Sequence, residues 1–295
     1  DGTWTWTYAA HHEDESATLF VPMPDSSLSP TDHLSVDTAK KTLGTMSCPS
    51  GWADFSLMTK KAQKWLDRAT LGKLHRRMFW FSLDRQFWPS VGFGLGCSLA
   101  SLDELSTFLD RPFYLKMMPL GGIIRTAKAG IRQLDAGFFG AGFPHPGVEC
   151  LVQQANTLAM HYGCNTTVGV KLLISMELLV IELGVSFQPL SLDWTTYSPR
   201  VTHSWLRSFW EKATAFGVEA QLNNLHLKFS RENDEWFMVA VEALGAFSPS
   251  ELLRINRVRL HQQVLFLSCI LCAGGKYLDR RYLRPRPAGA RWSRY

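Results

Sequence analysis

The residues with the clearest chemical potential in this sequence are the cations between positions 60 and 85. Only two aspartates, Asp67 and Asp84, accompany them, and the cations are Lys60, Lys61, Lys64, Arg68, Lys73, Arg76, Arg77 and Arg85. Aromatic residues such as Trp65 and Trp88 interleave with these cations. Lys and Arg make most protein contacts to a phosphate backbone, and neighbouring aromatic rings can stack on bases. The stretch therefore predicts a nucleic-acid-binding surface that includes Trp65. A structural alternative stays open, in which the aromatics are core and the cations a solvated face.

The charges are segregated along the rest of the chain, so the net charge of +5 understates them. No Lys or Arg precedes Lys40, whereas the tail from Lys276 onward is basic, with Asp279 as its only acidic residue. A third basic group consists of Arg254, Arg257 and Arg259, which we also take as nucleic-acid-binding candidates. Several basic stretches in one chain favour nucleic acid over an ordinary solvated face.

Motifs for catalysis are weak. The glycine-rich segment 92–98 lacks the Gly-Lys-Ser/Thr of a phosphate loop and the Gly-x-Ser-x-Gly of a nucleophile turn, so a simple turn is favoured. His145, His161 and His203 have no carboxylate partner at usable helical spacing and are expected to be structural or surface residues. We predict no catalytic residue in this chain.

Cysteine usage favours reduced thiols and an intracellular location, in the nucleus or the cytoplasm, because the six cysteines lack the short spacing of a disulfide-rich secreted domain. Cys269 and Cys272 form a C-x-x-C, but no second pair of ligands follows for zinc. The longest apolar run, 172–187, is interrupted by Glu177 and Glu182 and is expected to be a buried helix. The sequence thus predicts no metal site and no membrane partner.

The first fifty residues have the pattern of strands. Thr3–Tyr8 alternates polar and aromatic residues, and Thr18–Met23 follows as its expected hairpin partner. Prolines at positions 22, 24 and 30 mark a loop, and a third strand is expected over Lys41–Met46.

After residue 51 the apolar spacing becomes helical. Helices are expected from 57 to 69, from 74 to 88 with a stop at Pro89, and from a capping box at Ser101 to about 110. Glycine-punctuated turns follow up to a domain boundary near residue 145.

The second half is expected to be helical as well. Helices over 148–162 and 168–183 should end at Gly163 and Gly184, and another should cover 202–216. The segments 218–222 and 225–229 have the length of a hairpin. The helix opened by the capping box at Ser248 should extend to about 271.

The order of these elements resembles the end of the palm and the thumb of non-LTR reverse transcriptases. The resemblance is carried by Lys41-Thr42-Leu43-Gly44, by Lys64-Trp65, and by the segment 73–77. The resemblance implies that Lys41, Thr42, Leu43 and Gly44 form the strand that supports the primer terminus. It also implies that the helices between 60 and 88 form the thumb, which grips template-primer duplex.

Later segments are similar to retroelement polyproteins of diatoms and other microalgae, in the region between the polymerase and the RNase H-like domain. They are 85–89, 119–125, 144–149 and 257–268. The chain has no Asp-Asp pair, so the resemblance implies that the magnesium-binding palm centre lies before Asp1 and the RNase H-like domain after Tyr295. No cofactor is then expected in this chain itself.

The expected fold is mainly α with minor β. We expect the end of the palm at 1–50 with an N-terminal β-hairpin, a thumb-like helical domain at 51–145, a helical connection domain at 146–274 with a short β-hairpin, and a basic tail at 275–295. The expected partners are RNA–DNA or DNA duplex and the rest of the same polyprotein. Two alternatives are a stand-alone helical module that binds acidic proteins and an enzyme that uses the turn at 92–98.

Overall fold

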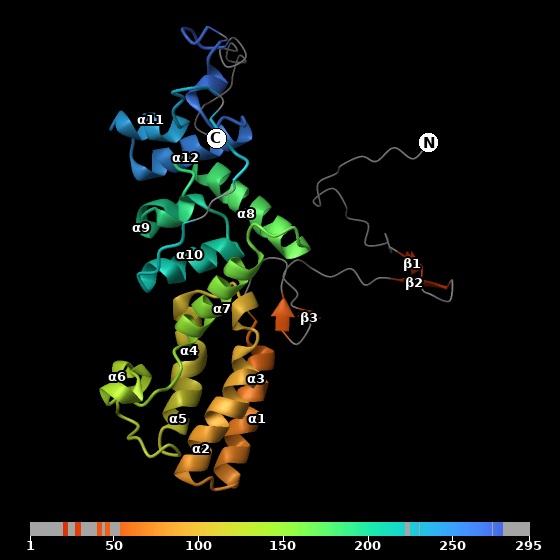
Figure 1. Ribbon diagram of the computed structural model, residues 1–295, viewed down its shortest axis with the longest axis vertical. Helices are drawn as coiled ribbons and strands as arrows, with labels where there is room; N and C mark the ends of the chain where they lie inside the picture. Colours follow the sequence, from red (N-terminus) through yellow and green to blue (C-terminus); the bar gives the residue numbers. More distant parts are fainter. Residues whose placement is uncertain are drawn as a thin grey trace, which may run out of the picture.

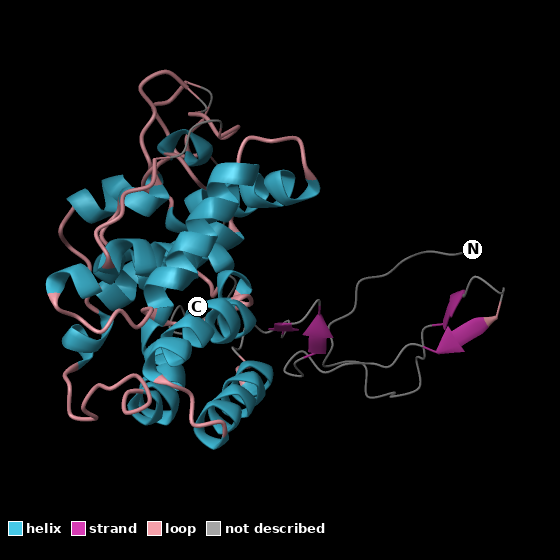
Figure 2. Ribbon diagram, turned by 60° about the horizontal axis from the view of Figure 1, so that its bottom comes forward, coloured by secondary structure: helices cyan, strands magenta, loops and turns pink. Residues whose placement is uncertain are grey.

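The chain folds mainly into helices, as the sequence predicts (Figure 1). The computed structural model describes residues 20–22, 27–30, 40–42, 45–47, 54–221, 225–229, 231–272 and 274–279. Figure 2 shows the helices packed together, with the short strands to one side of them.

The helical elements are numbered in chain order, with η2 and η4 as single π-helical turns and the other η elements as 3₁₀ turns. They are α1 (Ser56–Leu71), α2 (Arg76–Ser82), η2 (Leu83–Phe87), α3 (Trp88–Gly92), η3 (Leu95–Cys97), α4 (Leu102–Leu109), η4 (Asp110–Tyr114), α5 (Leu115–Met117), α6 (Ala129–Gln133), η5 (Ala136–Phe138), α7 (Pro146–His161), α8 (Thr167–Leu183), η6 (Pro189–Ser191), α9 (Trp194–Tyr197), η7 (Ser198–Arg200), α10 (Trp205–Ala215), α11 (Phe237–Ala243), α12 (Pro249–His261) and η8 (Leu267–Ile270).

Four short strands form two antiparallel pairs. β1 (Phe20–Pro22) pairs with β2 (Leu28–Pro30), and β3 (Lys40–Thr42) pairs with β4 (Thr45–Ser47). The predicted loop after Pro22 therefore contains the strand that pairs with β1, and Thr3–Tyr8 lies outside the described residues. The single strand predicted over 41–46 is wrong, because its two ends belong to two strands, β3 and β4, that pair antiparallel with Thr42 opposite Thr45.

Two helices pass through prolines that ordinarily end a helix. The sequence predicts a stop at Pro89, but η2 precedes it and the helix continues as α3 to Gly92. At the wide turn, the amide of Trp88 donates to the carbonyl of Leu83, five residues back. The helix expected to end near 110 likewise continues through Pro112 in η4 and into α5. A π turn can accommodate a residue that lacks the amide hydrogen and would crowd a regular α-helix, so proline does not end either helix.

The capping signals in the sequence are confirmed. The hydroxyl of Ser101 accepts from the Glu104 amide while the Glu104 carboxylate accepts from the Ser101 amide, and Ser248 and Glu251 form the same box at α12. Gly184 ends α8 with a left-handed φ of 63°, as expected for a glycine C-cap.

Two large hydrophobic clusters lie on the two sides of α7. The first gathers α1 to α5 around Phe79, Phe87 and Tyr114, and it includes Cys150 of α7. The second gathers α8, α10 and α11 around Trp210, and it includes Leu151, the next residue of α7. Because adjacent α7 residues face different clusters, this helix forms a shared wall between the two halves of the described body.

Two predictions in the second half are wrong. α12 ends at His261 rather than near 271, because Gln263 adopts a left-handed φ of 55° and the Val264 amide donates to the Arg259 carbonyl. No strands form in the described parts of 218–229. The Val218 amide instead closes the end of α10 by donating to Ala213, and the His226 amide donates to the Glu177 carboxylate.

Candidate nucleic-acid interface

The cations of α1 form one exposed stripe. Lys60, Lys64 and Arg68 are four residues apart, so they lie on the same side of the helix. All three are exposed, while Met58, Ala62, Leu66 and Ala69 face the core. None of the three pairs with a carboxylate in the described part of the chain. The amphipathic pattern of α1 thus turns the predicted phosphate contacts outward.

The turn from α1 to α2 adds three further exposed cations. Lys73 takes a left-handed φ of 45°, and Arg76 and Arg77 open α2. His75 caps this helix, since its Nδ1 accepts from the Arg77 amide at 3.4 Å. The two helices therefore bring cations 60–77 onto the same helical hairpin, in agreement with their grouping in the sequence.

The remaining two cations of this stretch are already engaged. The ammonium of Lys61 donates to the Ser90 carbonyl at 3.3 Å, which ties α1 to α3. Arg85 lies 3.2 Å from Asp84, and both side chains are exposed, so this ion pair is weak. These contacts make Lys61 and Arg85 less available to phosphate than the α1 stripe.

Trp65 is a core residue rather than a stacking surface. Its ring packs against Phe79 and Phe87, and its indole nitrogen donates to Ser82 Oγ at 3.1 Å. Trp65, Phe79 and Phe87 therefore pack in the core, as the structural alternative for this stretch expects. Phe81, in contrast, is exposed.

The third basic group separates into surface and core. Arg254 and Arg257 are exposed on α12, but Arg259 is only 3% exposed. The Arg259 guanidinium donates to the carbonyls of Ile181, Glu182 and Val264, so the prediction of a nucleic-acid contact there is wrong. Figure 1 places α12 and α1 at opposite ends of the helical body, so these arginines do not extend the α1 stripe.

The predicted primer-supporting strand is described only in part. Lys41 and Thr42 belong to β3, and Leu43 and Gly44 lie outside the described residues. β4 lies beside α1, so this hairpin adjoins the helix that carries the cation stripe.

The alternative chemical motifs are used structurally. Gln153 of α7 fixes the glycine-rich turn by accepting from the Gly96 amide and donating to the Gly92 carbonyl. His145 caps α7 through its Nδ1, which accepts from Gly147 and Val148, and burial lowers the pKa of His145 below its usual value. Among the described residues, no three His, Cys, Asp or Glu side chains group as a metal site.

Two further cations, Lys212 and Arg132, are buried, and the sequence does not predict their burial. Lys212 of α10 is fully buried and donates to Ala100 (2.7 Å) and to Ser208 Oγ (2.6 Å), which joins the two halves of the body. Burial lowers the pKa of Lys212. Arg132 is also buried and donates to Asp110 at 2.7 Å. Nothing in the local sequence distinguishes these cations from exposed ones.

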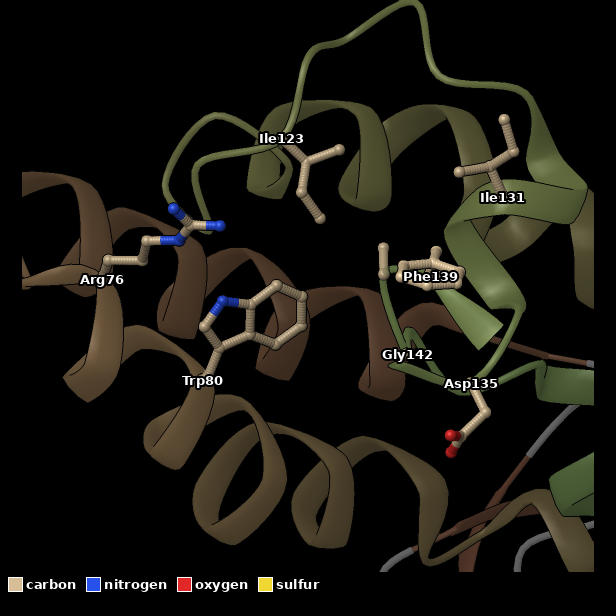
Figure 3. Close-up of a pocket in the computed structure, with 9 residues that line it drawn as sticks. Arg76, Trp80, Ile123, Ile131, Asp135, Phe139 and Gly142 are labelled. Atoms are coloured by element: carbon tan, nitrogen blue, oxygen red, sulfur yellow. The ribbon is translucent and has the colours of Figure 1, made fainter. Parts of the chain in front are cut away.

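A cavity of about 610 Å³ lies beside these cations, between α2 and the loop around α6, residues 123–142 (Figure 3). Arg76 and Trp80 line it from α2, and Ile123, Ile131 and Phe139 line it from the loop. The cavity joins Arg76, a predicted nucleic-acid contact, and Trp80, one of the aromatic residues interleaved with the cations, to Phe139, which the sequence does not single out.

Comparisons with known proteins do not identify a family. No family model matches the chain, and no curated protein or solved structure shows significant similarity to it. No described helix is long and apolar enough to cross a bilayer.

Proposed function

We propose that this chain is a non-catalytic part of a retroelement reverse transcriptase that binds template-primer duplex, with α1 and the start of α2 as its thumb-like grip. The proposed partners are RNA–DNA or DNA duplex and the rest of the same polyprotein. The magnesium ions and the polymerase chemistry belong, in this proposal, to a palm outside this chain.

One observation carries the proposal. Lys60, Lys64 and Arg68 form an exposed stripe without carboxylate partners in the described residues, and Lys73, Arg76 and Arg77 continue the positive charge at the adjoining turn. Cations held without internal ion pairs keep their charge available for phosphates. Contacts of this kind position a duplex without selecting its sequence.

The test compares two triple variants by fluorescence anisotropy with labelled blunt RNA–DNA and DNA duplexes. The first replaces Lys60, Lys64 and Arg68 with Ala. The matched control replaces Lys171, Lys228 and Arg231, which are exposed elsewhere, and removes the same charge. Each lost phosphate contact lowers the slope of log affinity against log salt by about 0.9. For the first variant we therefore expect a slope of log affinity against log salt that is shallower than the wild-type slope by about two to three. The control should have the wild-type slope.

Two outcomes would contradict the proposal. Equal effects of both variants would mean that affinity follows total charge rather than the α1 stripe. An absence of duplex binding by the wild type, together with binding to an acidic protein, would favour the stand-alone interaction module.

A further inference from the structure

The loop around α6 presents apolar side chains to solvent. Phe138 is 72% exposed and Phe139 is 97% exposed, and Ile124, Ile131 and Leu134 are exposed nearby. Phe139 also has a left-handed φ of 59°, which is costly for an aromatic residue. Exposed apolar clusters of this kind commonly mark interaction sites.

This loop is held in place by its own hydrogen bonds. The amides of Ala141, Gly142 and Phe143 donate to the carbonyls of Ile131, Leu134 and Arg132, respectively. The buried Arg132 also pairs with the half-buried Asp110, which ties α6 to η4. The exposed Phe138 and Phe139 therefore project from a braced loop, and they are not exposed through fraying.

The cavity beneath the loop combines an aromatic wall with a free cation. Figure 3 shows Trp80 and Arg76 entering from α2 and Phe139 from the loop. The Trp80 indole donates to the Gly121 carbonyl and its ring packs on Phe143, which fix its orientation. Arg76 pairs with no carboxylate among the described residues, and Asp135, the carboxylate that lines the cavity, accepts from the Gly137 amide at 2.7 Å.

The Arg76 end of the cavity favours an anionic group, whereas the Asp135 carboxylate lines the opposite end (Figure 3). The exposed Arg125 and Lys128 lie on the same loop as the exposed apolar residues. An occupant that combines negative charge with flat apolar groups matches both features, as an unpaired nucleotide does with its phosphate and base. The volume of about 610 Å³ lies in the range of small-ligand sites, about 300–1,000 Å³.

We infer that this cavity binds an unpaired nucleotide of a single-stranded overhang, with the base against Phe139 and Trp80 and the phosphate at Arg76. The site depends on the proposed function, since the overhang continues from the duplex held at α1. It adds a preference for duplexes that carry a single-stranded end.

The experiment measures the affinities of the full chain for a blunt duplex and for the same duplex with a short overhang. The wild type should prefer the overhang, and Phe139→Ala should lower that preference by about fivefold to a hundredfold without changing affinity for the blunt duplex. Phe139→Leu keeps an apolar side chain without a ring and should lose the preference too, whereas Phe139→Trp should retain it. Phe93→Ala is the control, because Phe93 is 66% exposed away from the cavity.

The outcomes separate the two proposals. If the wild type binds blunt duplex but shows no preference for the overhang, or if Phe139→Ala keeps the preference, the nucleotide site is wrong and duplex binding stands. If Phe139→Leu behaves as wild type and the chain binds vesicles of phosphatidylserine and phosphatidylcholine, the loop is a membrane contact instead. If no duplex is bound, the proposed function itself fails.

Discussion

The guanidinium of Arg259 lies directly against Gly184, so that a Cβ added to this glycine would be 2.7 Å from Arg259 Cζ. Gly184 ends α8, and Arg259 donates to the carbonyls of Ile181 and Glu182 in the last turn of that helix. A buried cation in the last turn of α12 thus satisfies the carboxyl end of α8, where it also complements the helix dipole.

Replacing Arg259 with Ala should destabilise the protein by about 3 kcal/mol, because several buried carbonyls would lose their donor. Burial lowers the pKa of Arg259 to about 10, so the side chain is charged at neutral pH. Urea unfolding followed by circular dichroism measures the change. Arg254→Ala on the same helix is the control and should cost less than about 0.5 kcal/mol, since Arg254 is exposed. Equal losses from the two variants would refute the buried role of Arg259.

Gly122→Ala should weaken nucleic-acid binding by displacing Arg76. Gly122 has a φ of 77°, and an added Cβ would lie 2.7 Å from Arg76 Nε. The matched control is Gly217→Ala, which lies outside the cavity lining and whose φ is 66° but whose added Cβ meets nothing within 4 Å. Both variants should lose about 1 kcal/mol of stability through backbone strain, while only Gly122→Ala should reduce affinity for duplex with an overhang. The idea fails if the two variants bind equally well.

Stability should decrease as the pH falls below about 6.5 because His145 caps α7 in its neutral form. Burial lowers the pKa of His145 in the folded chain, so the unfolded chain takes up a proton first, and stability is lost as the pH falls through the folded pKa. His145→Asn offers a cap that does not titrate. The free energy of unfolding of the wild type relative to this variant, measured in urea, should be constant above pH 7 and fall below pH 6; a constant difference across the whole range would contradict the role of His145 as a neutral cap.

Thiol modification at neutral pH should distinguish Cys272 from Cys150. Backbone hydrogen bonding at Tyr277 and neighbouring residues lowers the pKa of Cys272, whereas burial raises the pKa of Cys150 to about 11. Cys150 Sγ also donates to the Leu95 carbonyl in the core. Peptide mapping after iodoacetamide treatment should find Cys272 modified early and Cys150 only under unfolding conditions, and Cys272→Ser should remove the early product. Early modification of Cys150 in the folded chain would show that the hydrophobic cluster around Phe79, Phe87 and Tyr114, which contains Cys150, unfolds locally with ease.

Local signals predicted helix starts better than helix ends. The capping boxes at Ser101 and Ser248 depend on residues three apart, so the sequence alone contains them. The end of α12 depends on Gln263 in a left-handed conformation that glycine would usually mark, and the continuation past Pro89 depends on a π turn. Neither feature has a reliable signal in a single sequence.

The candidate site was predictable where amphipathic spacing decides exposure. Lys60, Lys64 and Arg68 lie opposite the apolar positions of their own helix, so their exposure follows from α1 alone. Arg259 could not be assigned in this way, because its burial comes from contacts with α8, more than seventy residues earlier in the chain. The cavity beside Arg76 likewise forms between α2 and a loop distant in sequence.

The shared position of α7 bears on how the protein would respond mechanically to a bound duplex. Cys150 and Leu151 are neighbours in the chain but belong to different hydrophobic clusters, and Lys212 bonds across the same boundary to Ala100. A swinging motion of α1 and α2 against α8 to α12 would have to separate α7 from one of the two hydrophobic clusters. We therefore expect the described helices to transmit force as one stiff lever.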